Sequence, residues 1–135
     1  MTVRTAMIER STKETRVSVS LAVDGRGKAD IKTGVGFLDH LLQLFAHHAL
    51  FDLTVRCEGD LEIDSHHSVE DVAICLGQAL DKALAERAGI VRTGHSYVPM
   101  DETLALAVVD LSGRSYAVID TGIDVPMLGQ MDADL

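Results

Sequence analysis

Alternating apolar and polar residues predict strands in the first third of the chain. The alternation runs from Arg16 to Val23 and from Lys28 to Ile31, which is typical of strands with one buried face. Between these segments, Asp24-Gly25-Arg26-Gly27 is a turn sequence, so the pattern predicts a β-hairpin. The run from Phe37 to His48 has helical apolar spacing, and Phe51 to Cys57 predicts another strand.

A second, longer helix is predicted to begin near His66. Asp64 or Ser65 is suited to cap its first turn, and Gly89 is suited to end it. Its apolar stripe consists of Val69, Val72, Ala73, Leu76, Leu80, Ala83 and Leu84. One unit of the chain is therefore a β-hairpin, a helix, a strand and a helix.

The sequence repeats itself at an offset of 88 residues. This offset pairs Glu14-Thr15 with Glu102-Thr103, since 102 − 14 = 88. Further identities in the same register pair Val3-Arg4-Thr5 with Val91-Arg92-Thr93, Gly25-Arg26 with Gly113-Arg114, and Thr33-Gly34 with Thr121-Gly122. The second copy is expected to repeat the hairpin, with strands at Leu104 to Leu111 and Ser115 to Ile119 around the turn Ser112-Gly113-Arg114.

The second copy is incomplete, because the chain ends near the equivalent of His47 (135 − 88 = 47). We therefore predict a first α+β half at 1–88 and an incomplete second half at 89–135 that holds strands only. A sheet without its covering helix exposes an apolar face, which favours either association or a chain cut from a longer natural one. We expect the second of these.

Composition and charge exclude several classes of protein. The chain has 135 residues, 47% of them hydrophobic, and a net charge of −9, so a generic binding surface for nucleic acid or anionic membrane is not expected. No apolar run approaches the roughly 20 residues that span a bilayer. Cys57 and Cys75 lack metal-type spacing and are predicted to be buried free thiols, which fits a reducing cytoplasm.

The start of the longer helix carries the strongest candidate chemistry. Successive helical residues are rotated by about 100°, whereas residues i and i+4 share a face. His66 and Glu70 can therefore bind one metal ion while His67 points toward another. A stable site normally needs three or four protein ligands, so the remaining ligands must come from elsewhere in the chain, from a second copy or from a bound ligand.

Five segments together resemble the imidazoleglycerol-phosphate dehydratase family. They are Gly36-Phe37-Leu38-Asp39-His40-Leu41-Leu42, Asp52-Leu53-Thr54-Val55, His66-His67-Ser68-Val69-Glu70-Asp71, Pro99-Met100-Asp101-Glu102 and Asp110-Leu111-Ser112-Gly113-Arg114. The resemblance runs from about Arg4 to Gly122 and implies two similar α+β halves, each a four-stranded sheet with two helices on one face, as in domain 2 of ribosomal protein S5. The family's second His-His-x-x-Glu motif is not in this sequence.

The resemblance also implies a function and a set of metal ligands. It implies a hydro-lyase, that is, a carbon–oxygen lyase, that dehydrates imidazole-glycerol phosphate in histidine biosynthesis. Two Mn²⁺ ions are implied for each complete active site, one held by His66 and Glu70 and the other by His67 and His40. Glu14 and Glu70 would be catalytic, Glu14 as the general acid and base. If the chain is instead an inactive fragment that lacks part of the ligand set, it would retain little manganese.

The family's substrate contacts and assembly follow from the same resemblance. Glu14 and His48 would contact the substrate, while Arg92 and Arg114 would bind its phosphate, for which the planar guanidinium group is well suited. The implied partner is the small-molecule substrate. A homo-oligomer is implied as well, either a trimer or the 24-subunit particle that is the family's metal-bound form.

Two other functions remain open on the sequence. His67-Ser68-Val69-Glu70 is close to the His-x-x-Glu-His motif of some zinc peptidases, but Asp71 stands where the second histidine would be. Alternatively, the chain is a catalytically inactive assembly fragment of the dehydratase that keeps only part of the ligand set. Without the resemblance, His40 would be a satisfied histidine at the edge of the core, and Glu14 and Arg114 would be ordinary solvated side chains. His47 and His95 have no assigned role.

Overall fold

The computed structural model describes residues 4–135, which form two compact units. One unit comprises Met1–Leu84 together with Ile123–Leu135, and the other comprises Ala85–Gly122. The predicted boundary at residue 88 falls near Leu84, whereas the end of the chain groups with the first unit. The division into family halves at 1–88 and 89–135 stays a prediction.

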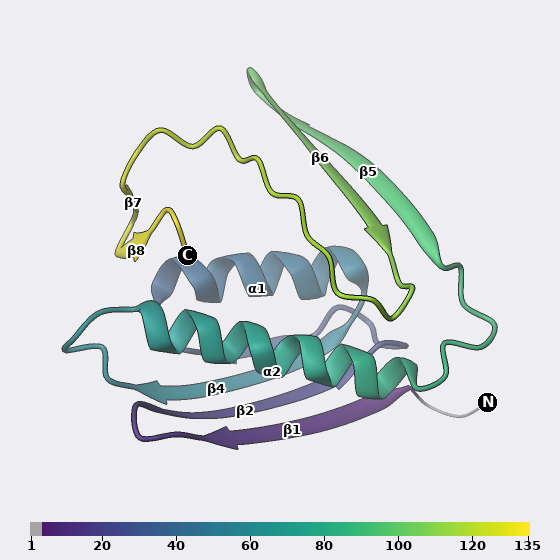
Figure 1. Cartoon of the computed structure of the whole chain (residues 1–135), viewed down its shortest axis with the longest axis horizontal. Coiled ribbons are helices and arrows are strands. Elements are labelled where there is room, and N and C mark those ends of the chain that lie inside the picture. Colours follow the sequence, from purple (N-terminus) through teal and green to yellow (C-terminus); the bar gives the residue numbers. More distant parts are fainter. Residues whose placement is uncertain (1–3) are drawn as a thin grey trace. The chain divides into compact units, whose positions relative to one another are not determined.

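A four-stranded sheet with two helices on one face forms most of the first unit (Figure 1). The strands are β1 (Thr5–Ser11), β2 (Thr15–Ala22), β3 (Ala29–Lys32) and β4 (Asp52–Gly59), and the helices are α1 (Gly36–Ala49) and α2 (His66–Leu84). The strand order is β1-β2-β4-β3, with β3 and β4 parallel and the other pairs antiparallel. The predicted α+β class is confirmed.

The core of this unit lies between the sheet and the two helices. Side chains at alternate positions of β2 and β4 are at most 1% exposed, namely Val17, Val19, Leu21, Leu53 and Val55. They pack against α1 and α2 through Leu42, Ala46, Val72, Cys75, Ala79 and Ala83. The predicted stripe of α2 was wrong at Ala73, which is exposed, because the buried face is centred on Cys75 and Ala79 instead.

The predicted hairpin between residues 16–23 and 28–31 is wrong, although both segments are strands. β4 lies between β2 and β3, and it pairs with both. The turn between β2 and β3 folds over the start of β4, where Asp52 Oδ1 accepts the backbone N–H groups of Arg26 (2.8 Å) and Lys28 (3.0 Å). A Cβ on Gly25 would lie 2.2 Å from the Asp52 nitrogen, so this approach requires glycine.

β1 is the true hairpin partner of β2, and the sequence pattern did not predict it. Five of its seven residues are exposed, so its alternation is weak. α2 ends at Leu84, before the predicted stop at Gly89, because Ala85 (φ 47°) leaves the helical conformation first. Cys57 and Cys75 are free thiols, as predicted, but only Cys75 is fully buried and Cys57 is half-buried. Burial raises the pKa of both thiols.

The second unit is built on a hairpin of β5 (Thr93–Met100) and β6 (Thr103–Asp110). Its register is that of β1 and β2 shifted by 88 residues: Thr5 pairs with Ala22, and Thr93 pairs with Asp110. The predicted strand at Ser115 to Ile119, and with it the predicted hairpin, is wrong. In the first unit the equivalent strand β3 pairs with β4, and the positions equivalent to β4 (52 + 88 = 140 to 59 + 88 = 147) lie beyond residue 135.

The last residues form a short hairpin of β7 (Met127–Leu128) and β8 (Met131–Asp132). Met131 is 6% exposed and packs with Val35 and Val69 of the first unit. Between residues 4 and 135, the helices are too short or too polar to cross a membrane.

Candidate metal-binding and substrate-binding site

The first turn of α2 presents His66 and Glu70 on one exposed face. The Asp64 carboxylate accepts the backbone N–H of His66 at 2.8 Å, which fixes the start of the helix at the predicted cap. One turn later Glu70 Oε2 lies 3.5 Å from His66 Nε2, and both side chains are about half exposed. An imidazole nitrogen and a carboxylate oxygen in this arrangement are a suitable pair of donors for Mn²⁺.

His67 points in a different direction and has a carboxylate partner of its own. Its Nδ1 lies 3.0 Å from Asp60 Oδ2 and 3.2 Å from Asp60 Oδ1. The His66 and His67 rings are inclined at 87° to each other. Hydrogen bonding to Asp60 leaves His67 Nε2 available as a metal donor, the arrangement in which an outer carboxylate fixes the tautomer of a ligating histidine.

The pKa of His67 reflects these neighbours. The hydrogen bond with Asp60 raises it most, and the nearby negative charges, including that of Glu14, raise it further. Asp60 was not predicted as a site residue. It lies in the loop seven residues before His67, and the sequence offers no periodicity that would pair the two.

His40 and His48 both lie on α1. The preceding residue, Asp39, accepts the backbone N–H and the hydroxyl of Thr33 at 2.9 and 2.6 Å, so His40 follows a well-anchored first turn. The His48 ring is 5.2 Å from that of His47, edge to face. Across residues 4–135, no three histidine, cysteine or acidic side chains converge as a metal-binding group, so the structure joins His66 with Glu70 but does not unite these with His40 and His67.

Glu14 lies on the turn between β1 and β2. The hydroxyl of Thr12 accepts the backbone N–H groups of Glu14 (3.1 Å) and Thr15 (2.9 Å), which gives the turn a defined shape. The charge of Glu14 contributes to the raised pKa of His67. The predicted general acid and base is therefore within electrostatic range of a predicted metal ligand.

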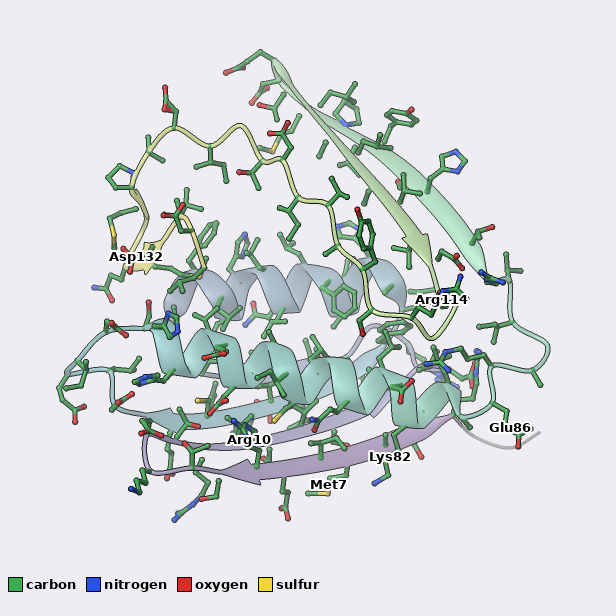
Figure 2. All side chains as sticks on the ribbon, in the orientation of Figure 1. Met7, Arg10, Lys82, Glu86, Arg114 and Asp132 are labelled. Carbon is green, nitrogen blue, oxygen red and sulfur yellow. The ribbon has the colours of Figure 1, made fainter. Side chains whose placement is uncertain are left out.

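The two predicted phosphate-binding arginines lie in the second unit, at the open end of the β5–β6 hairpin. Arg92 Nε and Nη2 donate to the two oxygens of Asp110 at 2.6 and 2.9 Å. The pKa of Asp110 is lowered, chiefly by the hydrogen bond from Arg92 and also by the charge of Arg114, so both guanidinium groups are close to this carboxylate. Figure 2 shows Arg114 beyond the end of β6. Glu14 and His48 belong to the other unit.

The fold and the start of α2 together define a class of protein. It is an α+β protein with a mixed four-stranded sheet, two helices on one face, and a helix that begins with two histidines and a glutamate suited to metal binding. A family model described as imidazoleglycerol-phosphate dehydratase matches residues 33–135, and the chain belongs to that family.

Individual relatives agree with the family assignment. The chain is 61% identical over 132 residues to imidazoleglycerol-phosphate dehydratase of Chloroflexus aggregans, a match that covers 98% of this chain and 64% of the relative. For the Chloroflexus aurantiacus protein the identity is 59%, with 98% and 65% covered. The chain thus spans just under two thirds of the length of these curated relatives.

Solved structures of the same family have the same fold. The crystal structure of imidazoleglycerol-phosphate dehydratase from Staphylococcus aureus superposes with a TM-score of 0.84 at 35% identity, covering 96% of this chain and 71% of that one. The enzyme from Pyrococcus furiosus, solved in complex with (S)-C348, gives a TM-score of 0.68 at 37% identity, with 84% and 59% covered. The predicted family resemblance is confirmed.

Proposed function

We propose that the chain acts as an imidazoleglycerol-phosphate dehydratase, a hydro-lyase of histidine biosynthesis. The reaction removes a proton from the carbon attached to the imidazole ring and the hydroxyl from the next carbon, releasing one water and giving imidazole-acetol phosphate. The observation that supports this best is the divergence of two donor sets at the start of α2. His66 lies near Glu70 on one face, while His67 is held by Asp60 on another.

The donors present fit manganese. His66 and Glu70 would hold one Mn²⁺, and His67 and His40 would hold the other, with further ligands from outside the described residues. Bound Mn²⁺ would act as a Lewis acid that stabilises negative charge on the substrate's imidazole ring. Asp60 supports this role, because it orients His67 so that Nε2 is free to bind.

The remaining residues bind the substrate and move its proton. Glu14 would take the proton from the ring-attached carbon, with its backbone held by Thr12. His48 would contact the glycerol hydroxyls, and Arg92 and Arg114 would bind the phosphate. Asp110 already orients the Arg92 guanidinium group by two hydrogen bonds, so that group is fixed before phosphate arrives.

The zinc peptidase is disfavoured by the environment of Asp71. A His-x-x-Glu-His site needs its second histidine ligand at this position, but the Asp71 carboxylate found there is buried and accepts hydrogen bonds from Arg10 and Thr15. It is therefore not available to a metal on the exposed face of α2.

The direct test is turnover of imidazole-glycerol phosphate by the metal-loaded chain. The chain is incubated with Mn²⁺ and substrate, and the product, lighter by one water, is followed by mass spectrometry. We expect Glu14→Gln to lower kcat by about 10²- to 10⁴-fold, the usual contribution of a general acid and base. Lys13→Gln, at the neighbouring position of the turn, is the matched control and should retain turnover.

Two further measurements complete this test. Arg92→Lys and Arg114→Lys should raise KM, because lysine loses the bidentate fork, whereas Arg26→Lys, at the repeat position equivalent to Arg114, should not. Light scattering should show a homo-oligomer, a trimer or the 24-subunit particle. Absence of turnover at saturating Mn²⁺, under conditions in which a longer relative is active, would overturn the proposal in favour of an inactive assembly fragment.

A further inference from the structure

Asp71 is a buried carboxylate that connects three elements of the first unit. It lies on α2 with a side chain 8% exposed, and its Oδ1 accepts a hydrogen bond from Arg10 Nε of β1 at 2.9 Å. Its Oδ2 accepts the hydroxyl of Thr15, which is itself 4% exposed at the start of β2. Figure 2 shows Arg10 between β1 and α2.

The position of Asp71 relates it to both parts of the candidate site. It is four residues after His67, so the two side chains lie on the same face of α2, one turn apart. On the other side of the contact, Thr15 is the residue next to Glu14. The hydrogen bond between Asp71 and Thr15 is thus a direct link between the helix of the candidate metal ligands and the turn of the candidate general base.

Hydrogen bonds within the β1–β2 turn extend this link from Thr15 to Glu14. Thr12 Oγ1 accepts the N–H groups of Glu14 and Thr15, and Thr12 N–H donates to the Thr15 carbonyl at 2.9 Å. The hydroxyls of Thr12 and Thr15 also lie 3.3 Å apart. Because Thr12 is hydrogen-bonded both to Thr15 and to the backbone N–H of Glu14, fixing Thr15 on α2 also restrains the backbone of Glu14 through Thr12.

Burying a carboxylate between a helix and a sheet costs free energy, because the charged group loses its hydration. Apolar side chains of similar volume usually serve stability as well or better, because they avoid the loss of hydration. A carboxylate instead provides directional hydrogen bonds, which hold the turn in one place rather than merely against the helix. The hydrogen bonds of Asp71 are therefore better suited to positioning the β1–β2 turn than to stabilising its packing on α2.

We propose that Asp71 is a positioning residue, which through Thr15 holds Glu14 at a fixed place relative to His67. This inference rests on the proposed function, in which Glu14 moves the proton and His67 helps to bind the metal. Asp71 touches neither substrate nor metal in this account. Its effect on the reaction is exerted through the hydroxyl of Thr15.

The test removes the hydrogen bond between Thr15 and Asp71 by replacing Thr15, which lies outside α2 and its candidate metal ligands. Thr15→Val keeps the β-branched shape but removes the hydroxyl, and Thr15→Ser keeps the hydroxyl. Val17→Ala is the control, because Val17 is buried on the same face of β2 and its loss weakens the core while leaving the link intact. In the full chain, NMR measures amide hydrogen exchange at Glu14 and Thr15 and nuclear Overhauser contacts between the turn and α2; kinetics measure kcat and KM.

We expect Thr15→Val to speed exchange at Glu14 and Thr15 about tenfold relative to β4, the factor for loss of one hydrogen bond to a charged group. It should lower kcat about tenfold with KM within about twofold, and Thr15→Ser should restore both. Val17→Ala should lower the denaturation midpoint without selectively speeding amide exchange at Glu14 and Thr15.

Unchanged exchange and contacts in Thr15→Val would overturn the proposal, and so would the same selective loosening in Val17→Ala. If the wild-type chain shows no turnover, the proposed function fails while exchange and contacts still decide the positioning role. If turnover is present but Thr15→Val keeps the wild-type kcat, the positioning role fails and the function stands.

Discussion

Replacement of Asp39 by alanine should destabilise the first unit by about 2–3 kcal/mol. Asp39 Oδ1 accepts both donors of Thr33, which is 1% exposed. The Thr33 hydroxyl is also 3.3 Å from the Val35 carbonyl, so it keeps an acceptor, whereas the backbone N–H loses its bond. An orphaned buried donor costs about 1–3 kcal/mol, and the lost first-turn carboxylate of α1 adds about 0.3–1 kcal/mol.

Urea denaturation followed by circular dichroism measures this change through the free energy of unfolding. Asp39→Asn is the matched control, since it keeps an oxygen at the accepting position and loses only the charge, so it should cost about 1 kcal/mol. His40 follows directly on the same turn and should lose order with Asp39→Ala, seen as faster amide exchange. A free energy within about 0.5 kcal/mol of wild type for Asp39→Ala would refute this reasoning.

Three further predictions concern the sheet and the end of α1. Leu53→Ala, at a 1% exposed site in the centre of the sheet, should cost about 3 kcal/mol in urea denaturation, whereas Leu44→Ala, 41% exposed, should cost under about 0.5 kcal/mol. Leu50 adopts φ 57° at the end of α1, a conformation that is strained for leucine, so Leu50→Gly should raise the thermal midpoint of unfolding. A lowered midpoint would contradict the inference that Leu50 is strained. Backbone hydrogen bonds lower the pKa of Asp52, so its stabilising contribution is complete above its unfolded pKa of about 4 and is lost as pH falls through the folded value. The stability difference between wild type and Asp52→Asn should therefore shrink in acid, and a constant difference would count against this role.

The helices and the strands β2, β3, β4 and β6 could be predicted from the periodicity of their apolar residues. The run at 37–48 became α1 within a residue or so at either end, and the segment at 51–57 became β4. The strand order could not be predicted, since the alternation of β2 says that one face is buried but not which strand lies beside it. The turn after β2 resembles a hairpin turn in sequence, yet its contacts with Asp52 direct the chain across the start of β4.

The site was predictable where its residues are close in sequence. The pairing of His66 with Glu70, and the divergence of His67, follow from helical geometry alone and are seen in the structure. The partners of these groups come from tertiary contacts. Asp60 and Thr15 reach α2 only when the loop and the β1–β2 turn are folded against it, and no periodicity in the sequence marks them.

The proposed function depends most on the start of α2 carrying donors for two separate metal ions. Equilibrium dialysis against saturating Mn²⁺, followed by elemental analysis, measures the number of ions bound by wild type, His66→Ala, His67→Ala and the double variant. We predict that each single replacement removes one of the two manganese sites and that the double replacement removes both. Loss of all bound manganese in either single variant, or undiminished binding in the double variant, would contradict it.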